Sequence, residues 1–237
     1  MTDAISGETV TYQYDALKRL TGATSTAAAN SQAYGYDGFG NLVSKALGAV
    51  AAVAIPVNAG SNQLSNAGYD LNGNTNSGSG ATLTCDVANR VTSSQTVGGG
   101  SVKEYYGYGP DNKRVWRMKT DGTEEWTMYG ARGEKIGVYK PLVSEVFDSS
   151  DPPEWVTDTL TFVTLRESVW FDGRLVAEGG SAVLQDRLGT NRAGGAKFTA
   201  YGEEIGTATA NDRTKFGTYN RDGFTGLDYA SPAPLIH

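Results

Sequence analysis

A tyrosine-aspartate pair recurs along the whole chain, and it constrains the fold more than any other feature of the sequence. Clear copies stand at Tyr14-Asp15, Tyr36-Asp37 and Tyr69-Asp70. Variant copies change one of the two residues: Cys85-Asp86, Tyr108-Gly109, Tyr129-Gly130, Phe171-Asp172, Gln185-Asp186, Tyr201-Gly202 and Tyr219-Asn220. The copies recur about every 20 residues, apart from one skipped position and one insertion. Self-similarity at such a period predicts an array of one small structural unit.

Each copy has the residues of a β-hairpin. Residues 10–12 (Val-Thr-Tyr) precede Tyr14, and β-branched and aromatic residues favour a half-buried strand. Asp15 has a side chain that bonds the N–H groups of a tight turn. A second short strand follows, as in residues 41–43. Because a lone hairpin is only marginally stable, the units must pair with one another. The sequence therefore predicts an all-β array of antiparallel hairpins.

The composition agrees with this fold class. The 237 residues include 31 Gly, as an array rich in turns requires, and 13 Tyr within a hydrophobic content of only 39%. The apolar stretch 46–57 is interrupted by Gly48 and Pro56, and a membrane-spanning helix needs about 20 residues, so we expect inserted strands and no membrane insertion. We expect the array to cover residues 1–230 and to be followed by a flexible tail, residues 231–237.

The charge of the chain argues against nucleic-acid binding. The net charge is −6 and the pI is near 4.9, and no cluster of Lys and Arg offsets the repulsion of phosphates. The N-terminus, MTDAISGETV, has neither a basic segment nor an apolar segment of a signal peptide. A cytoplasmic chain or one exported by a non-classical route is one interpretation. Because no capping element precedes the first unit, the favoured interpretation is that the sequence is an excerpt of a longer protein.

Residue counts limit the chemistry that the chain can perform. It has one Cys and one His, so an internal disulfide framework, a Ser-His-Asp triad and a His/Cys zinc site are not expected. Cys85 stands where neighbouring units have Tyr or Phe, which favours a packing role. The alternative, a nucleophilic thiolate, needs a histidine partner, and the single histidine is the last residue, His237.

Carboxylate chemistry remains an alternative. Glu203 and Glu204 lie near Asp212, and Asp222 and Asp228 flank a Phe-Thr-Gly segment. Adjacent residues on a strand point to opposite faces, so the two glutamates do not form a catalytic pair with each other. We expect these side chains to be solvated turn residues, and we predict no catalytic residue and no cofactor.

A calcium site is the alternative interpretation of one asparagine-rich segment. Asp70, Asn72, Asn74 and Asn76 offer oxygen ligands at alternate positions. The glycine is Gly73 instead of the sixth residue of the loop, and the twelfth residue is alanine instead of a bidentate glutamate. A hairpin turn is therefore the favoured interpretation.

One segment departs from the repeat. Residues 142–160 contain the pair Pro152-Pro153 and five carboxylates, which are Glu145, Asp148, Asp151, Glu154 and Asp158. This composition predicts an acidic, exposed loop insertion within one hairpin.

Several segments carry a resemblance to a known family. YDALKRL (residues 14–20) and CDVANRV (85–91) are similar to a YDxxGRL unit. WFDGRLVAE and VLQDRLGTNRAGG (170–195), followed by YGEE, and then KFGTYNRDGFTGLDYA (215–230), are similar to the end of a repeat core. Together they resemble the RHS/YD-repeat family, which includes bacterial RHS proteins and animal teneurins, and in particular the C-terminal part of its repeat core.

The resemblance implies a fold and a function. Family members are strips of antiparallel hairpins that spiral into a hollow shell, which encloses a C-terminal effector in bacterial toxins and serves cell-surface contact in other members. After Leu227 to Ala230 the chain continues as SPAPLIH, where the family has an Arg-Tyr-Tyr segment and a D-P-x-G-L motif. Aspartyl self-cleavage and toxicity are therefore not carried over.

We thus expect a non-enzymatic structural module whose partners are the remainder of a longer RHS protein or a C-terminal effector. Two alternatives stay open. A glycan- or receptor-binding adhesion module would use Trp116, Trp126 and Trp155 as stacking platforms. An enzyme remnant of the self-cleaving type is the other alternative.

Two physical expectations follow from the array. The rings of Tyr14, Tyr36 and Tyr69 should be buried against neighbouring units, and the loss of such a ring costs about 3–5 kcal/mol. The first strand, residues 9–14, should present an unpaired edge that associates with another copy. At the other end, Pro232 and Pro234 should interrupt strand pairing.

Overall fold

The chain folds into two compact units, each formed by two separate parts of the sequence. The computed structural model describes residues 2, 7–78, 80–96, 102–148, 154–206 and 208–230, with the backbone alone for 145–148 and 154–158. Unit 1 contains Met1–Ser79 and Gly194–Thr209, and unit 2 contains Gly80–Ala193 and Ala210–His237. In both units a strip of hairpins comes first, and a later segment of the chain returns to it.

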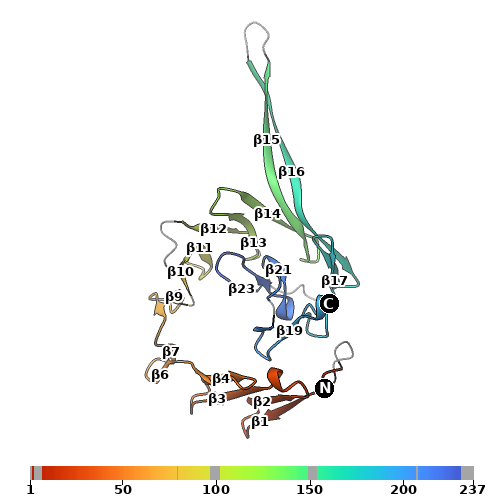
Figure 1. Cartoon of the computed structure of the whole chain (residues 1–237). Helices are drawn as coiled ribbons and strands as arrows, with labels where there is room; N and C mark the ends of the chain where they lie inside the picture. The colour runs from red at the N-terminus through yellow and green to blue at the C-terminus, as the bar shows by residue number, and fades with distance from the viewer. Residues whose placement is uncertain are drawn as a thin grey trace. The chain divides into compact units, whose positions relative to one another are not determined.

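Unit 1 is built on a five-stranded antiparallel sheet in chain order (Figure 1). Its strands are β1 (Val10–Tyr14), β2 (Leu20–Ser25), β3 (Gln32–Tyr36), β4 (Leu42–Leu47) and β5 (Val53–Ala54), with the 3-10 helix η1 (Ala28–Asn30) between β2 and β3. Two hairpins follow, β6 (Val57–Asn58) with β7 (Gln63–Leu64) and β8 (Gly68–Tyr69) with β9 (Thr75–Gly78). The later segment of unit 1 contributes β19 (Lys197–Phe198) and β20 (Glu204–Ile205), and η2 (Ala193–Gly195) lies at its start.

Unit 2 repeats this organisation on a larger scale. Its strands pair in chain order: β10 (Ala81–Cys85), β11 (Val91–Thr96), β12 (Glu104–Tyr108), β13 (Arg114–Met118), β14 (Glu124–Tyr129), β15 (Lys135–Asp148), β16 (Glu154–Phe171), β17 (Arg174–Glu178) and β18 (Ser181–Ala182). The later segment contains β21 (Arg213–Thr214), η3 (Phe216–Thr218), β22 (Asn220–Arg221) and β23 (Asp228–Tyr229), and its three strands form a small sheet.

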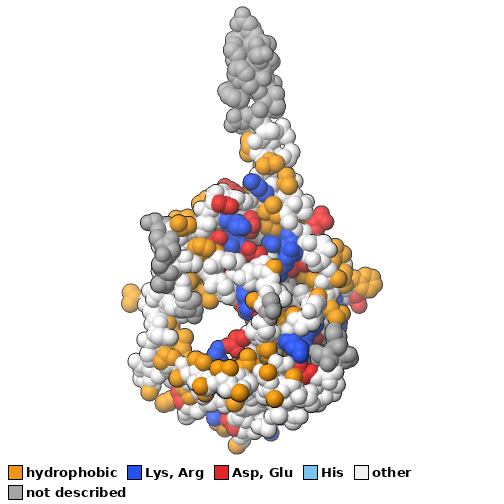
Figure 2. Space-filling model, viewed as in Figure 1, with side chains coloured by type: hydrophobic (Ala, Val, Ile, Leu, Met, Phe, Trp, Pro, Cys, Tyr) orange, Lys and Arg blue, Asp and Glu red, His pale blue; other side chains and the backbone are white. Residues whose placement is uncertain are grey.

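The loop insertion expected at residues 142–160 lies in the outer half of the β15–β16 hairpin. The two strands pair from Gly137 opposite Glu167 out to Asp148 opposite Glu154, and the hairpin extends beyond the neighbouring strands (Figure 1). Exposed Val143, Leu160 and Phe162 lie on its stem, where apolar side chains are visible in Figure 2. Asp151 and Pro152-Pro153 lie outside the described residues, as do the tail residues 231–237 and therefore Pro232 and Pro234.

The predicted all-β class is confirmed. The described residues form antiparallel strands with three short 3-10 helices, and they include no α-helix. None of the helices in this part of the chain is long and apolar enough to cross a bilayer. Buried apolar residues are few and include Tyr34, Tyr106 and Leu175, while buried polar residues include Glu104, Arg117 and Glu178. Hydrogen bonds and ion pairs therefore carry much of the packing within each unit.

Candidate functional site

One five-residue turn closes most of the hairpins. In the first of them the N–H of Asp15 donates to the carbonyl of Arg19 at 3.0 Å, and the N–H of Lys18 donates back to the carbonyl of Asp15 at 3.0 Å. The same pair of bonds begins at Asp37, Asp70, Asp86, Gly109, Lys119, Gly130, Asp186 and Thr199. The fourth residue of the turn has positive φ, as in Lys18 (φ 64°) and Gly40 (φ 94°), which explains the glycines and asparagines at this place.

The aspartate holds the turn closed. Oδ1 of Asp15 accepts the N–H groups of Leu17 and Arg19, both at 2.9 Å, and Oδ2 accepts Nε of Arg19 at 2.6 Å. These hydrogen bonds, first of all the one from the Arg19 backbone, hold the pKa of Asp15 below its ordinary value. The two backbone bonds recur at Asp37, Asp70, Asp86 and Asp186. The repeated aspartate is thus a turn-forming residue.

The asparagine-rich segment follows the same scheme. Oδ1 of Asp70 accepts the N–H groups of Asn72 and Asn74, and Oδ2 accepts the Asn74 side chain at 2.9 Å. Within the part of the chain that the structure describes, no group of three or more His, Cys, Asp or Glu side chains is arranged to hold a metal ion. Both oxygens of Asp70, the carboxylate that would head a calcium loop, accept hydrogen bonds within the hairpin turn.

A second set of contacts, here called the inter-hairpin contact, joins each hairpin to the one before it. The hydroxyl of Tyr36 donates to the carbonyl of Leu20 at 2.8 Å, and the guanidinium carbon of Arg19 lies 4.8 Å from the centre of the Tyr36 ring. Arg19 also bonds Asp15 and, through Nη1, the carbonyl of Asp37 at 3.0 Å. One arginine thus links its own turn to the aromatic ring and the turn of the next hairpin.

The inter-hairpin contact recurs in unit 2. Tyr108 donates to the carbonyl of Val91 at 2.7 Å beneath Arg90, and Tyr129 donates to the carbonyl of Arg114 at 3.1 Å beneath Lys113. In the next hairpin Trp170 takes the place of tyrosine, and its indole N–H donates to the carbonyl of Lys135 at 2.7 Å. Each acceptor carbonyl lies in the residue directly after the five-residue turn. Burial raises the pKa of Tyr108 to about 12, which keeps its hydroxyl a donor.

Buried charges fasten the later segment of unit 2 to its strip. We call Glu104, Arg114, Arg117, Asp212 and Asp222 the charge cluster. Nε of Arg117 donates to Glu104 at 2.7 Å, and Nη1 donates to Asp212 at 2.7 Å. Burial raises the pKa of Glu104, although Arg117 opposes this effect. Burial would also raise the pKa of Asp212, but the charge of Arg117 and its hydrogen bond hold it below its ordinary value.

Arg114 completes the charge cluster. Its guanidinium carbon lies 4.7 Å from the ring centre of Tyr106 and 4.5 Å from that of Tyr229, and its Nη1 lies 3.4 Å from Oδ2 of Asp222. The backbone N–H of Arg114 donates to the hydroxyl of Tyr229 at 2.7 Å. Oδ1 of Asp222 caps a turn by accepting the N–H groups of Phe224 and Thr225. The later segment is therefore bonded to β12 and β13 through both its turn and its aromatic ring.

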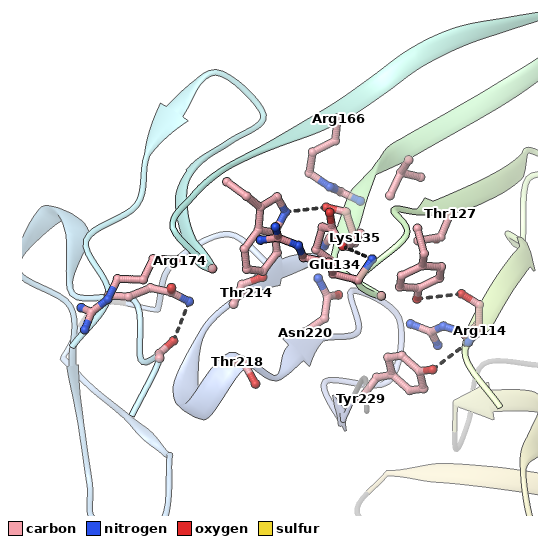
Figure 3. Close-up of a pocket in the computed structure, with 18 of the residues that line it drawn as sticks. Arg114, Thr127, Glu134, Lys135, Arg166, Arg174, Thr214, Thr218, Asn220 and Tyr229 are labelled. Carbon is pink, nitrogen blue, oxygen red and sulfur yellow. Dashed lines mark hydrogen bonds between the residues drawn. The ribbon is translucent and has the colours of Figure 1, made fainter. Parts of the chain in front are cut away.

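A cleft of about 1000 Å³ lies in unit 2 between strands β13–β16 and the later segment (Figure 3). Glu178 lies beside it, and its buried carboxylate accepts Nζ of Lys135 at 2.6 Å and the N–H of Thr214 at 2.9 Å. The cleft is lined by the cations Arg114, Arg117, Arg132, Lys135, Arg166, Arg174 and Arg187 and by the carboxylates Glu125, Glu134, Asp172, Asp186 and Asp212. Cations thus outnumber carboxylates in the cleft of a chain whose net charge is −6.

Unit 1 holds its later segment mainly through one carboxylate and a group of tyrosines. Glu8 accepts Nζ of Lys197 at 2.6 Å, Nδ2 of Asn30 at 2.9 Å and the hydroxyl of Ser25. The Tyr201 ring lies edge-on to the Tyr34 ring at a centroid distance of 4.9 Å.

Two further contacts complete the attachment in unit 1. The hydroxyl of Tyr201 bonds that of Tyr36, and Lys45 pairs with Glu203. The Tyr36 ring is thus shared between the inter-hairpin contact and the later segment.

Comparisons with known proteins agree with this architecture. The family model described as RHS Repeat matches residues 1–30. A search of curated proteins gives no match. The fold is similar to the crystal structure of TcdB2-TccC3, with a TM-score of 0.56 and 18% identity over 94% of this chain and 14% of that chain. It is also similar to TcdB2-TccC3-Cdc42 (TM-score 0.54, 17% identity, 93% and 13% covered). A third is the Tc holotoxin pore of Photorhabdus luminescens (TM-score 0.53, 16% identity, 94% and 13% covered).

The resemblance to the RHS-repeat family is confirmed. The sequence match covers the first hairpin, and the similarity of fold covers nearly all of the chain. The chain spans only 13–14% of the length of the solved chains that it matches.

The five-residue turn occurs at most of the predicted repeat positions. Asp15, Asp37, Asp70, Asp86 and Asp186 each begin one, and Tyr36, Tyr108 and Tyr129 make the inter-hairpin contact. The hydroxyl of Tyr69 instead accepts the N–H of Leu64 at 3.0 Å.

Tyr14 is not buried as the sequence predicted. The residue is 59% exposed, so the expectation that its ring is buried against a neighbouring unit is wrong. The reason is positional: the inter-hairpin contact needs a carbonyl and a cation from the preceding hairpin, and β1 and β2 form the first hairpin of the sheet.

At three other predicted repeat positions, the residue does not stand directly before or at the start of a five-residue turn. Asp172 and Gly173 (φ 47° and 72°) form a two-residue turn that joins Phe171 to Arg174, without the five-residue arrangement. Tyr201 lies inside the turn that begins at Thr199. Tyr219 accepts the N–H of Lys215 and so stands after a turn, not before it.

One five-residue turn lies at none of the predicted repeat positions. It begins at Lys119 and joins β13 to β14, and Asp121, two residues later, accepts the N–H of Thr123 at 2.8 Å. The signal that identifies it is the glycine at its fourth place, Gly122, with φ 79°.

The two units divide the other candidate residues: Glu204 belongs to unit 1, and Cys85, Asp212, Asp222 and Asp228 belong to unit 2. Cys85 ends β10 opposite Val91 and is half-buried. Asp212 and Asp222 belong to the charge cluster, while Asp228 pairs with Arg221 at 2.8 Å. Glu204 accepts the N–H of Thr209 at 3.0 Å. Trp155 has a side chain outside the described residues.

Proposed function

We propose that this chain is a non-enzymatic structural RHS module that contributes part of the wall of a β-shell around an effector domain of a longer protein. The observation that carries the proposal is the inter-hairpin contact. The tyrosines, turn aspartates and basic residues of the repeat are bonded to one another, as at Asp15, Arg19 and Tyr36. Such groups build a continuous wall and leave little of the repeat for chemistry.

Two further observations support it. The solved structures similar to the chain are toxin assemblies, and this chain spans a small part of their length. In each unit a later segment lies on the strip of hairpins, so the strip already uses part of its surface to hold polypeptide. Secretion or surface display of the longer protein, with the remainder of that protein as partner, belongs to the same proposal.

The test is protease protection of the effector in the full-length protein that carries this sequence. We expect the effector to resist limited proteolysis in the native protein and in Tyr14→Ala, which alters an exposed ring. Tyr36→Ala and Tyr108→Ala should expose it, because they remove inter-hairpin contacts. Equal cleavage of the effector in all four proteins would contradict the proposal.

The non-enzymatic part has its own test. The carboxylates most suited to chemistry, Asp212 and Asp222, form bonds within the charge cluster and a turn. We expect one intact mass after prolonged incubation of the purified chain at acid and neutral pH. A defined fragment that disappears in Asp222→Asn would show self-cleavage instead.

A glycan-binding module is the second candidate, because an aromatic stripe crosses three strands of unit 2. Trp116 lies opposite Trp126, and Trp126 lies opposite Tyr139, so these rings occupy one face of the sheet. Both indole N–H groups donate to Glu124, and Trp126 is 38% exposed. Binding on a glycan array that is lost in Trp126→Ala, with an unchanged melting temperature, would support this candidate over the structural one.

Self-association through an edge strand is a further part of the proposal. β1 ends the five-stranded sheet of unit 1, and most of its residues are exposed. Unpaired edges of this kind add strands from other chains. Light scattering over a dilution series should show concentration-dependent association, and a strictly monomeric chain would contradict it.

A further inference from the structure

Two buried hydrogen-bond donors of unit 2 have no partner among the described residues. They are Nε of Arg166 and Oγ of Ser168. Nearly all buried polar atoms in proteins are bonded, and a buried group without a partner costs about 1–3 kcal/mol. Two such donors two residues apart therefore require an explanation.

Both donors belong to one face of β16. Arg166 pairs with Val138, Glu167 with Gly137 and Ser168 with Glu178, and the irregularities of register lie outside these three residues. Alternate residues of a regular strand point to the same side, so Arg166 and Ser168 share a face. Arg166 lines the cleft, and Figure 3 shows it beside Lys135. Ser168 therefore lies on the same face of β16 as Arg166, which lines the cleft.

Among the described residues, Arg166 lacks the carboxylate partner that Lys135 and Arg117, two other cations of the cleft, have. Lys135 pairs with Glu178 at 2.6 Å, and Arg117 pairs with Glu104 and Asp212 at 2.7 Å. Arg166 takes part in none of the ion pairs formed by the described side chains. Its charge still acts on its neighbours, since it contributes, after burial and Arg117, to the pKa of Asp212.

We propose that this cleft binds an oxyanion, a carboxylate or a phosphate, through the guanidinium of Arg166 and the hydroxyl of Ser168. A guanidinium presents planar donors that match the oxygens of such groups, and a charge-assisted bond of this type is about twice as strong as a neutral one. The volume of about 1000 Å³ exceeds that of a single oxyanion and has room for the group that carries it. The site lies wholly within unit 2 and does not depend on the proposed shell.

The test uses the purified chain and two probes, which distinguish a small free oxyanion from a carboxylate carried by a peptide. The probes are inorganic phosphate and an end-blocked tetraglutamate peptide, with an end-blocked tetraglutamine peptide as the neutral control. Binding is followed by calorimetry and by the amide signals of residues 166–168. The variants are Arg166→Gln, Ser168→Ala and Lys103→Gln. The last removes one positive charge from an exposed position of unit 2 and serves as the matched control.

We expect at least one anionic probe to bind the native chain and Lys103→Gln equally, and tetraglutamine not to bind. Arg166→Gln should weaken binding roughly tenfold or more, and Ser168→Ala roughly three- to tenfold. Binding of phosphate alone assigns the site to a small oxyanion, and binding of the peptide assigns it to an acidic side chain.

Three results would overturn the inference. They are no binding of either probe at about 10 mM, an affinity of Arg166→Gln equal to the native value, and an equal loss in Lys103→Gln. The first result would mean that solvent satisfies both donors. Should Arg166→Gln fail to fold, as judged by its melting curve, Ser168→Ala decides, because it keeps the charge and removes one donor.

Discussion

The two units differ in the side-chain contacts that attach their later segments. Each unit holds a later segment of the chain against a strip of hairpins. Unit 1 does so with Glu8, a carboxylate that accepts bonds from three side chains, and with the rings of Tyr34, Tyr36 and Tyr201. Unit 2 does so with the charge cluster, in which Arg117 is 7% exposed and Glu104 is 2% exposed. Unit 1 therefore combines one carboxylate with aromatic contacts, whereas unit 2 relies on a cluster of buried ions.

This difference predicts a difference in tolerance to mutation. Buried ions lose their hydration, and a partner that is removed leaves the remaining charge buried and uncompensated. A lost aromatic contact forfeits packing but leaves no charge behind. Unit 2 should therefore be the more sensitive to single substitutions that break its attachment.

The largest expected effect is that of Arg117→Gln. The substitution leaves Glu104, Asp212 and Asp222 without their shared cation, and breaking such a buried pair costs about 3–5 kcal/mol. Urea unfolding followed by tryptophan fluorescence measures the loss in unit 2, because all four tryptophans (116, 126, 155 and 170) belong to that unit.

Two further variants test whether the uncompensated charge causes this loss of stability. Arg174→Gln removes an exposed arginine of the same unit and should change the free energy of unfolding by about 0.5 kcal/mol or less. The double substitution Glu104→Met with Arg117→Met should regain part of the lost stability, because it removes charges on both sides. A double variant as unstable as Arg117→Gln would show that packing, and not uncompensated charge, decides.

The next effect is that of Tyr36→Ala in unit 1. The half-buried ring makes both the inter-hairpin contact and the contact with Tyr201, so its removal should cost about 2–3 kcal/mol. Tyr36→Phe, which loses the bond to the Leu20 carbonyl, should cost about 1 kcal/mol.

The matched control is Tyr14→Ala. This ring holds the same place in the repeat but is 59% exposed, so we expect a change of about 0.5 kcal/mol or less. Thermal unfolding followed by the amide signals of unit 1 compares the two variants. Equal losses would mean that the repeat position, and not the preceding hairpin, determines the role of the tyrosine.

The sequence was sufficient to predict what is local. Where a turn begins with aspartate, that side chain bonds residues two and four places away, as Asp15 bonds Leu17 and Arg19, so its role follows from the motif itself. The turn at Lys119 escaped prediction because neither residue of the Tyr-Asp pair marks it: Met118 and Lys119 stand at these two places.

What is distant in sequence could not be predicted. Arg117 and Asp212 are 95 residues apart, and no spacing rule links them. The inter-hairpin contact is intermediate, since it needs only the preceding hairpin, and this requirement explains why Tyr36 has it and Tyr14 does not. Asp212 and Asp222 looked like solvated turn residues for the same reason: the side chain that neutralises them, Arg117, comes from a strand far earlier in the chain.

A third prediction concerns acid. Burial would raise the pKa of Glu8, yet the hydrogen bonds from Lys197, Ser25 and Asn30 and the charge of Lys197 lower it from 4.5 to about 2. A carboxyl group whose pKa is lower in the folded protein stabilises it above the unfolded pKa, and that contribution is lost as the pH falls through the folded pKa. Unit 1 should therefore lose on the order of 2 kcal/mol between about pH 5 and pH 2.

The pH dependence is measured through the unfolding of unit 1 followed by its amide signals. Glu8→Gln should be less stable than the native chain at neutral pH and should show a flatter dependence on acid. A native chain and a Glu8→Gln variant with parallel pH profiles would assign the acid sensitivity to other carboxylates.

The smallest expected effect separates the two lysines that hold the later segment of unit 1. Lys45 pairs with Glu203, but their side chains are 37% and 43% exposed, and exposed pairs contribute about 0–1 kcal/mol. Lys197 pairs with the nearly buried Glu8, so its loss leaves that carboxylate without its cation.

Lys45→Gln should therefore lower the free energy of unfolding by about 0.5 kcal/mol or less, and added salt should remove the difference. Lys197→Gln should cost several times more and should keep most of that cost in salt. Equal, salt-sensitive losses in the two variants would mean that both lysines act as surface charges, and the attachment of unit 1 would then depend on its tyrosines alone.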